Sequence, residues 1–162
     1  MMEIEGLLRT MRAAGVEMIV VGGVAATIHG SARLTQDLDV VYRRSPENLS
    51  RLAAALRPHA PYLRGAPPGL PFLFDAETLR RGLNFTLATS LGAIDVLGEI
   101  AGGGTYESLL PDSRPVAAFG HEFLCLDLPR LIQVKRAAGR PKDLEAIAEL
   151  EALLADRERP QS

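Results

Sequence analysis

The sequence predicts an α+β fold, in which helices pack on a mixed β-sheet. Two observations carry this prediction. Segments with helical spacing of apolar residues are interleaved with short β-branched runs, in the order helix, strand, helix, strand, helix, hairpin and then helices. The 162 residues, of which 47% are apolar and 23% charged, suffice for one substantial core. We therefore expect one domain over residues 1–156 and a disordered tail at residues 157–162.

The N-terminal part of the chain is expected to form a helix, a strand and a second helix. Apolar residues at helical spacing predict the first helix over residues 4–14. The β-branched run at residues 18–21 predicts a strand that ends in a turn at Gly22 and Gly23. The alanine-rich stretch at residues 24–29 predicts a short helix. A glycine turn between a strand and a helix brings backbone N–H groups toward a phosphate.

A second strand and a well-capped helix follow. Apolar residues alternate with Asp37 and Asp39 along the strand expected at residues 37–41, so the acids and the apolar side chains should face opposite sides. Ser45 is expected to cap a helix over residues 46–57, with proline in the first helical position.

The remaining elements are a loop, a hairpin and two helices. Five prolines and two glycines at residues 58–71 predict a surface loop or lid. Residues 83–88 and 93–97 are expected to pair as a β-hairpin. A helix capped by an aspartate is expected at residues 128–138, and a last helix at residues 142–155. The apolar stripe of this last helix comprises Leu144, Ile147, Leu150 and Leu154.

Composition and charge limit the classes of protein that this chain can represent. Eighteen basic and twenty acidic residues give a net charge of −2, so no overall basic field would attract DNA or RNA. The single cysteine, Cys125, cannot form an internal disulfide and is expected to be a small buried residue. No segment approaches the roughly 18 to 20 apolar residues of a membrane span, and the N-terminus lacks an apolar signal core. We therefore expect a cytoplasmic protein.

Three acidic residues form the strongest candidate site. Asp37 and Asp39 are two residues apart on one expected strand, so both carboxylates leave the same face and can share one hard cation or bridge two. Taken alone, such a pair is more typical of a solvated surface. Asp95, however, interrupts the apolar run Ala-Ile-Asp-Val-Leu, where a carboxylate without a partner is costly to bury. Together with the glycine turn, these acids indicate a metal-dependent phosphate site.

A glycine turn, Asp-x-Asp on the second strand and a third acid on a later strand together resemble the nucleotidyltransferase superfamily. The matching segments are Val21-Gly22-Gly23, Asp37-Leu38-Asp39 and Ile94-Asp95-Val96. The chain is most similar to small prokaryotic nucleotidyltransferases related to the AbiEii toxin of abortive-infection and toxin–antitoxin systems. This similarity covers nearly the whole chain, through Gly-Gly-Val-Ala, His-Gly, Arg-Leu-Thr-Gln-Asp-Leu-Asp-Val-Val and Lys-Arg-Ala-Ala-Gly-Arg-Pro-Lys-Asp-Leu. It implies a single nucleotidyltransferase-like domain with that family's mixed β-sheet.

The resemblance implies that Asp37, Asp39 and Asp95 bind Mg²⁺, with Asp37 and Asp39 as its main ligands. Asp95 would either complete the metal site or act as the base toward the attacking group. If two cations bind, about 3.5–4 Å apart, they could stabilise the attacking and the leaving oxygens. Magnesium takes one or two protein carboxylates together with substrate phosphates and waters, so these few acids suffice.

Six further residues are candidates for nucleotide binding, with an alternative role open for several. The glycines would let the triphosphate approach the backbone, and the hydroxyl and cationic groups would contact its oxygens. The hydroxyl groups of Ser31 and Thr35 could instead be ordinary polar groups of a loop. Arg33 could pair with Asp37 or Asp39 in the metal-free protein. In the same region, Lys142 and Asp143 could serve only to cap the last helix, with Arg140 solvated. The six candidates are Gly22, Gly23, Ser31, Arg33, Thr35 and Lys135.

These expectations lead to three functional hypotheses. In the first, an enzyme transfers a nucleoside monophosphate from an NTP such as ATP to an acceptor, with release of pyrophosphate. That acceptor could be a tRNA end, a protein hydroxyl or a small molecule, and the loop at residues 58–71 could select it. In the second, a toxin–antitoxin component works by binding a cognate partner protein, with transfer secondary or lost. In the third, the chain binds nucleotide as a regulator without turnover. A homodimer could complete the cleft.

Overall fold

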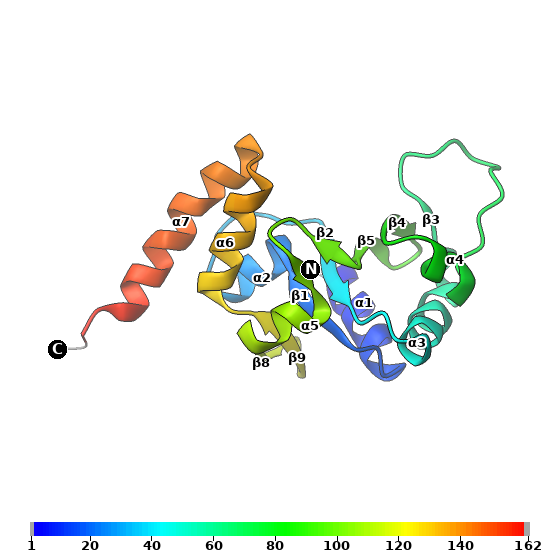
Figure 1. The fold of residues 1–162 in the computed structure, drawn as a ribbon, viewed down its shortest axis with the longest axis horizontal. Helices are drawn as coiled ribbons and strands as arrows, with labels where there is room; N and C mark the ends of the chain where they lie inside the picture. Colours follow the sequence, from blue (N-terminus) through cyan, green and yellow to red (C-terminus); the bar gives the residue numbers. More distant parts are fainter. Residues whose placement is uncertain (1, 161–162) are drawn as a thin grey trace.

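A mixed β-sheet forms the centre of the protein (Figure 1). The computed structural model describes residues 2–160, and in this part of the chain seven strands pair in the order β3-β4-β5-β2-β1-β9-β8, with a separate ribbon of β6 and β7. Strand β2 runs parallel to β5, and β1 runs parallel to β9. The strands are β1 (Met18–Val21), β2 (Asp37–Tyr42), β3 (Tyr62–Leu63), β4 (Asn84–Thr89), β5 (Gly92–Leu97), β6 (Glu99–Ile100), β7 (Gly104–Thr105), β8 (Ser113–Ala118) and β9 (His121–Leu126).

Helices pack on this sheet, which confirms the α+β class. Helix α1 packs with α3 and against β2 and β5, whereas α2 packs against β1, β2 and α6. Helix α7 lies alongside α6, and Figure 1 shows this pair at the opposite end of the molecule from the long loop between β3 and α4. The helices are α1 (Met2–Ala13), α2 (Gly22–Ile28), α3 (Pro46–Leu56), α4 (Ala76–Arg81), α5 (Tyr106–Leu109), α6 (Leu128–Ala138) and α7 (Pro141–Glu158), with short 3₁₀ turns at Arg57–His59 and Leu110–Asp112.

Side-chain caps set the ends of two long helices. Ser45 accepts a hydrogen bond from the N–H of Asn48 at the start of α3, and Asp127 accepts one from the N–H of Arg130 at the start of α6. At the end of α6, Gly139 has a φ of 65°, a left-handed conformation that glycine adopts without steric cost. The chain can therefore reverse directly into α7, which brings the two helices side by side.

A buried asparagine ties α3 to the chain on either side of the first strand pair. Asn48 is fully buried, and its Oδ1 accepts a hydrogen bond from the N–H of Glu17 at 2.7 Å. Its Nδ2 donates to the carbonyl oxygens of Glu17 at 2.9 Å and of Arg43 at 2.7 Å. One amide side chain thus satisfies three backbone groups at the start of β1 and the end of β2.

Replacing Asn48 by alanine should destabilise the fold. The change leaves the backbone groups of Glu17 and Arg43 without these partners in a site closed to water, so we expect the free energy of unfolding to fall by about 2–4 kcal/mol. Urea unfolding followed by circular dichroism measures the loss. Glu47→Ala, at an exposed neighbouring position on the same helix, is the control and should change the stability by less than about 0.5 kcal/mol.

The helices and strands that the sequence predicts lie close to their expected positions. The strand at residues 18–21 and the helix at residues 128–138 have their expected bounds. The two hairpin strands begin and end within one residue of their expected bounds. Cys125 is buried, as expected for a small apolar residue. Across the described part of the chain, every helix is too short or too polar to traverse a membrane.

Two local expectations near the candidate site are wrong. The helix expected from residue 24 begins at Gly22, so Gly22 and Gly23 are its first two residues, and Gly22 alone, with a φ of 65°, has the left-handed backbone of a turn. The stretch at residues 58–71 is not loop alone, because Tyr62–Leu63 pairs with β4 as the edge strand of the sheet. The hairpin of β8 and β9 was not predicted either.

The last helix differs from expectation in its buried face and in its length. Leu144 is 55% exposed, because Asp143 takes the inward position in the first turn and Ile147 and Leu150 continue that face. The helix also continues to Glu158, so the expected tail at residues 157–162 begins inside it. Residues 161–162 lie outside the described residues.

Candidate active site

Three carboxylates come together on two adjacent strands. In the parallel pair of β2 and β5, Asp39 lies opposite Asp95, and Asp37 lies opposite Ala93. Because side chains alternate between the faces of a strand, the three acids share one face, while Leu38 between two of them is fully buried on the other. The expectation that acids and apolar residues of this strand face opposite sides is confirmed for Leu38 and Val40, whereas Val41 falls on the face of the acids.

The start of α2 lies directly against these acids. Gly22 has a φ of 65°, and a Cβ atom added to it would lie 2.2 Å from Asp39 Oδ2. A Cβ atom on Gly23 would lie 2.7 Å from Oγ1 of Thr35, which itself donates to the carbonyl oxygen of Asp37 at 3.2 Å. Both Cβ distances are too short for a real contact, so a larger residue would force the site apart. The glycines therefore permit a close approach of backbone to acid.

Asp39 is the acid that its surroundings perturb most. Burial raises the pKa of Asp39 to about 7, helped by the negative charges of Asp95 and Asp37. Its Oδ1 is buried and has no hydrogen-bond partner within residues 2–160. An unpartnered buried carboxylate oxygen is costly. Asp39 is therefore suited to take up a proton or a cation.

The raised pKa makes stability depend on pH. Folded Asp39 keeps its proton up to about pH 7, whereas an unfolded aspartate with a pKa of 3.8 has lost it, so the folded state binds more protons between these values. In the absence of divalent metal, the free energy of unfolding should therefore fall as the pH rises from about 4 to about 7. Asp39→Asn should remove this dependence and raise the free energy of unfolding at about pH 8 by about 1–3 kcal/mol. The measurement is urea unfolding in the presence of a chelator, from about pH 5 to about pH 8. The same dependence of the free energy of unfolding on pH in the wild-type protein and in Asp39→Asn would contradict this expectation.

Arg64 lies between two of the acids. Its Nη2 donates to Asp95 Oδ1 at 2.6 Å and lies 3.8 Å from Asp37 Oδ2. Its Nη1 donates to the carbonyl oxygen of Leu87 at 3.1 Å, and its backbone N–H donates to that of Thr86 at 2.9 Å. These backbone contacts to β4 fix where the guanidinium sits.

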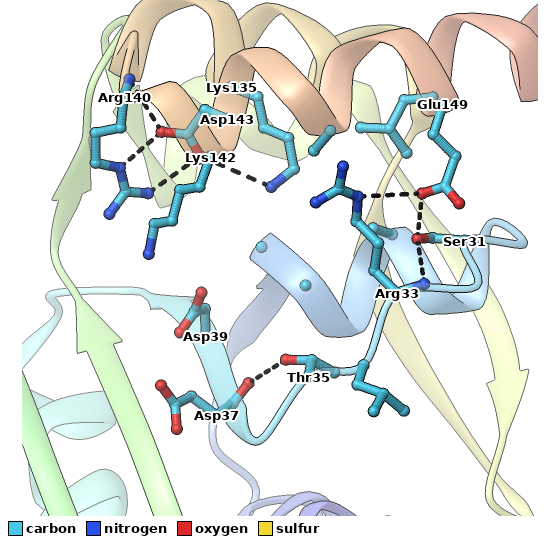
Figure 2. A pocket seen from close by; sticks show the side chains of 16 residues that line it. Ser31, Arg33, Thr35, Asp37, Asp39, Lys135, Arg140, Lys142, Asp143 and Glu149 are labelled. Atoms are coloured by element: carbon cyan, nitrogen blue, oxygen red, sulfur yellow. Dashed lines mark hydrogen bonds and ion pairs between the residues drawn. The ribbon is translucent and has the colours of Figure 1, made fainter.

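No sequence signal marks Arg64, which belongs to the proline-rich stretch after α3. The pairing with the acids that was open for Arg33 is made by Arg64 instead, because the unpredicted strand β3 brings it beside β4 and β5. Arg33 lies elsewhere in the cleft, with its Nε 3.9 Å from Glu149 Oε1 (Figure 2).

Ser31 and the residues after it are held to α7. Ser31 Oγ donates to Glu149 Oε1 at 2.5 Å, and the N–H of Ala32 donates to Glu149 Oε2 at 3.2 Å. Figure 2 shows Ser31, Arg33 and Glu149 as one group on the wall of the cleft. The hydroxyl group of Ser31 is thus engaged by an acid, and Glu149 is a site residue that the sequence pattern did not reveal.

Lys135 faces the acids from α6. Burial lowers the pKa of Lys135, against the opposing effects of Asp143 and Asp39. Its Nζ lies 4.0 Å from Oδ1 of the buried Asp143, which also accepts a hydrogen bond from Arg140 Nε at 2.6 Å. Asp143 accepts from the backbone N–H of Arg140 as well, so its capping role is confirmed, and Arg140 is paired with it. This network holds a cation opposite Asp39, across the cleft (Figure 2).

All of the predicted site residues except Asp95 line one cavity of about 260 Å³. Its walls come from α2, the segment before β2, the start of β2, α6 and α7 (Figure 2). Asp95 lies beside this cavity on the next strand, where Arg64 covers it. The cavity brings together Asp37, Asp39 and all six candidates for nucleotide binding, namely Gly22, Gly23, Ser31, Arg33, Thr35 and Lys135.

The acids can be tested for their fit to a metal ion. Among the described residues, no set of three or more His, Cys, Asp and Glu side chains is gathered as a metal-binding group. Arg64 takes the position of a cation between Asp37 and Asp95. The donors are nevertheless hard carboxylate oxygens, which Mg²⁺ prefers, and no residue in the described part of the chain hydrogen-bonds to Asp39 Oδ1. The carboxylates fit magnesium if the guanidinium of Arg64 moves out from between Asp37 and Asp95.

No protein-family model matches the sequence, and no curated protein matches it. The resemblance to AbiEii-related nucleotidyltransferases therefore stays a prediction from motifs, and function is argued from the site itself.

Proposed function

We propose that the protein is a Mg²⁺-dependent nucleotidyltransferase, which transfers a nucleoside monophosphate from an NTP to an acceptor hydroxyl. One observation carries this proposal: Asp37 and Asp39 lie beside Asp95 on parallel strands, across a cleft from the half-buried Lys135. Carboxylates for a divalent metal, opposite a cation for phosphate oxygens, are the groups that nucleotidyl transfer requires.

Cationic side chains on one side of the cleft are suited to hold the triphosphate. Lys135, Arg33 and Lys142 all line the cavity, and Gly22 and Gly23 leave its floor free of side chains. The side chain of Lys135 is only 15% exposed, so its charge acts through a medium less polar than water. Such fixed charges accelerate the reaction by positioning and by electrostatic stabilisation.

In the proposed reaction, the acceptor oxygen forms a bond to the α-phosphorus, and the bond from that phosphorus to the oxygen bridging to the β-phosphate breaks. Pyrophosphate leaves with the electron pair of that bond. Mg²⁺ held by Asp37, Asp39 and Asp95 would neutralise charge on the phosphate oxygens when bound. Alternatively, Asp95 is not a metal ligand and takes the proton of the attacking hydroxyl once Arg64 moves from its Oδ1. Lys135 would neutralise charge on the departing pyrophosphate.

A nucleotide-binding module without turnover is a second candidate. The ion pair of Arg64 with Asp95 favours it, because a guanidinium fixed there would keep a catalytic metal out. Such a module would act through a partner protein, as in the toxin–antitoxin hypothesis.

Label transfer distinguishes the two candidates. The purified protein is incubated with Mg²⁺, each α-³²P-labelled NTP in turn and a cell extract as acceptor source, and both label transfer and pyrophosphate are followed. We expect transfer that falls by about 100-fold or more in Asp37→Asn/Asp39→Asn. Asp156→Asn, an exposed acid near the end of α7, is the control and should retain activity. Nucleotide binding without pyrophosphate release in the wild-type protein would favour the module without turnover.

Arg64 should compete with the metal. Because its guanidinium already contacts Asp95 and lies near Asp37, Arg64→Gln removes a positive charge from the place that a cation would take. We expect the affinity for Mg²⁺, measured by isothermal titration calorimetry, to rise about 3- to 10-fold. Arg81→Gln, an exposed arginine paired with Glu77, is the control. Unchanged or weaker Mg²⁺ binding in Arg64→Gln would show that Arg64 supports the acids rather than competing for them.

A further inference from the structure

A second cavity, of about 230 Å³, adjoins the first. The two share five wall residues, so they are the two halves of one cleft on either side of Asp39 and Lys135. Figure 2 shows four of the shared residues, with Asp39 on one wall and Lys135, Asp143 and Arg140 on the other. The shared residues are Gly22, Asp39, Lys135, Arg140 and Asp143.

The two halves differ in character. The first is lined by charged and hydroxyl-bearing side chains, among them Arg33 and Lys142. The second has mainly aliphatic walls from the ends of β1 and β5, from β6 and the residue after it, and from α6, and Asn84 and Glu99 are the polar residues that line this half alone. These aliphatic residues are Val21, Leu97, Ile100, Ala101, Leu131, Val134 and Ala138.

Strand alternation connects the aliphatic half to the acids. Leu97 is two residues beyond Asp95 on β5, so both side chains leave the same face of the sheet. Val134 and Ala138 are four residues apart on α6, one on either side of Lys135 in sequence, and line the cleft together. A ligand whose phosphate lies at Asp39 can therefore extend along this face, between β5 and α6, without leaving the cleft.

We propose that the aliphatic half of the cleft binds the nucleobase of the substrate nucleotide. This inference rests on the proposed function, because it takes the charged half as the triphosphate site. A nucleoside triphosphate has one polyanionic end and one flat heteroaromatic end, and the cleft has the same polarity from end to end. Together its two halves lie within the range of about 300–1,000 Å³ that is usual for small-molecule sites.

The acceptor is expected to approach the acids from a different side than the nucleobase. In phosphoryl transfer the attacking and leaving oxygens lie roughly in line across the phosphorus. With the leaving pyrophosphate toward Arg33, the attacking group has to come from the side of Asp95. There Thr86 lies opposite Asp95 on β4 and is exposed, so that flank of the sheet is open to a second substrate. The enclosed aliphatic half is left for the base.

Filling the aliphatic half tests this assignment. Isothermal titration calorimetry in Mg²⁺ compares α,β-methylene-ATP, which cannot undergo transfer, with inorganic tripolyphosphate, which lacks base and ribose. We expect wild-type protein to bind the analogue about tenfold or more tightly than tripolyphosphate. Ala138→Phe, from a half-buried position, should abolish this difference and leave tripolyphosphate binding unchanged. Gln133→Phe, at an exposed position on the same helix, is the matched control and should behave as wild type.

A second variant covers the case in which Ala138→Phe fails to fold. Ile100→Ala removes part of the wall instead of filling the space, and should weaken binding of the analogue several-fold without affecting tripolyphosphate. Equal affinity of the wild-type protein for both ligands, or a preference for the analogue that survives in both variants, would overturn the base assignment and leave the triphosphate site standing. Binding of neither ligand by folded wild-type protein would overturn the proposed function, and the base assignment with it.

Discussion

The register between β2 and β5 sets Asp39 directly opposite Asp95, and the candidate site follows from this pairing. A shift of one residue would turn every side chain of a strand to its other face, burying the acids and exposing residues such as Leu38 and Ile94. With the observed register, the acids are close enough that burial and mutual repulsion raise the pKa of Asp39. Ionised Asp39 is therefore electrostatically unfavourable in the folded protein, and a bound cation would offset that unfavourable energy.

The elements around the acids leave these carboxylates accessible to a ligand. Gly22 lets α2 begin against Asp39 without a side chain between them, and Lys135 is held near by the buried Asp143. Arg64 relieves part of the repulsion in the absence of metal, through contacts at the edge of the sheet. The same residues would thus stabilise the free protein and have to rearrange when a metal arrives. Stability and the capacity to bind metal are opposed at this site.

What the sequence could predict here was local. The alternation of acids and apolar residues in β2 and the cap of α6 at Asp127 are each encoded within a few residues, and both are present. The hydrogen bond of Arg64 to Asp95 joins residues that are 31 positions apart in the chain, and that of Ser31 to Glu149 joins residues 118 positions apart. No local sequence pattern encodes such contacts. Leu144 shows a related limit, because periodicity places a residue on a helix face without telling which part of that face is covered.

Uptake of a divalent cation by the acids tests the central claim most directly. Electron paramagnetic resonance of Mn²⁺ reports the free ion, and titration with wild-type protein should remove this signal, more completely when a non-hydrolysable NTP analogue is added. In Asp37→Asn/Asp39→Asn, shown by circular dichroism to be folded, the affinity for Mn²⁺ should be at least about tenfold lower. Equal uptake of Mn²⁺ by the two proteins, with and without the analogue, would contradict the account, because the ion would then bind somewhere other than the acids of β2 and β5.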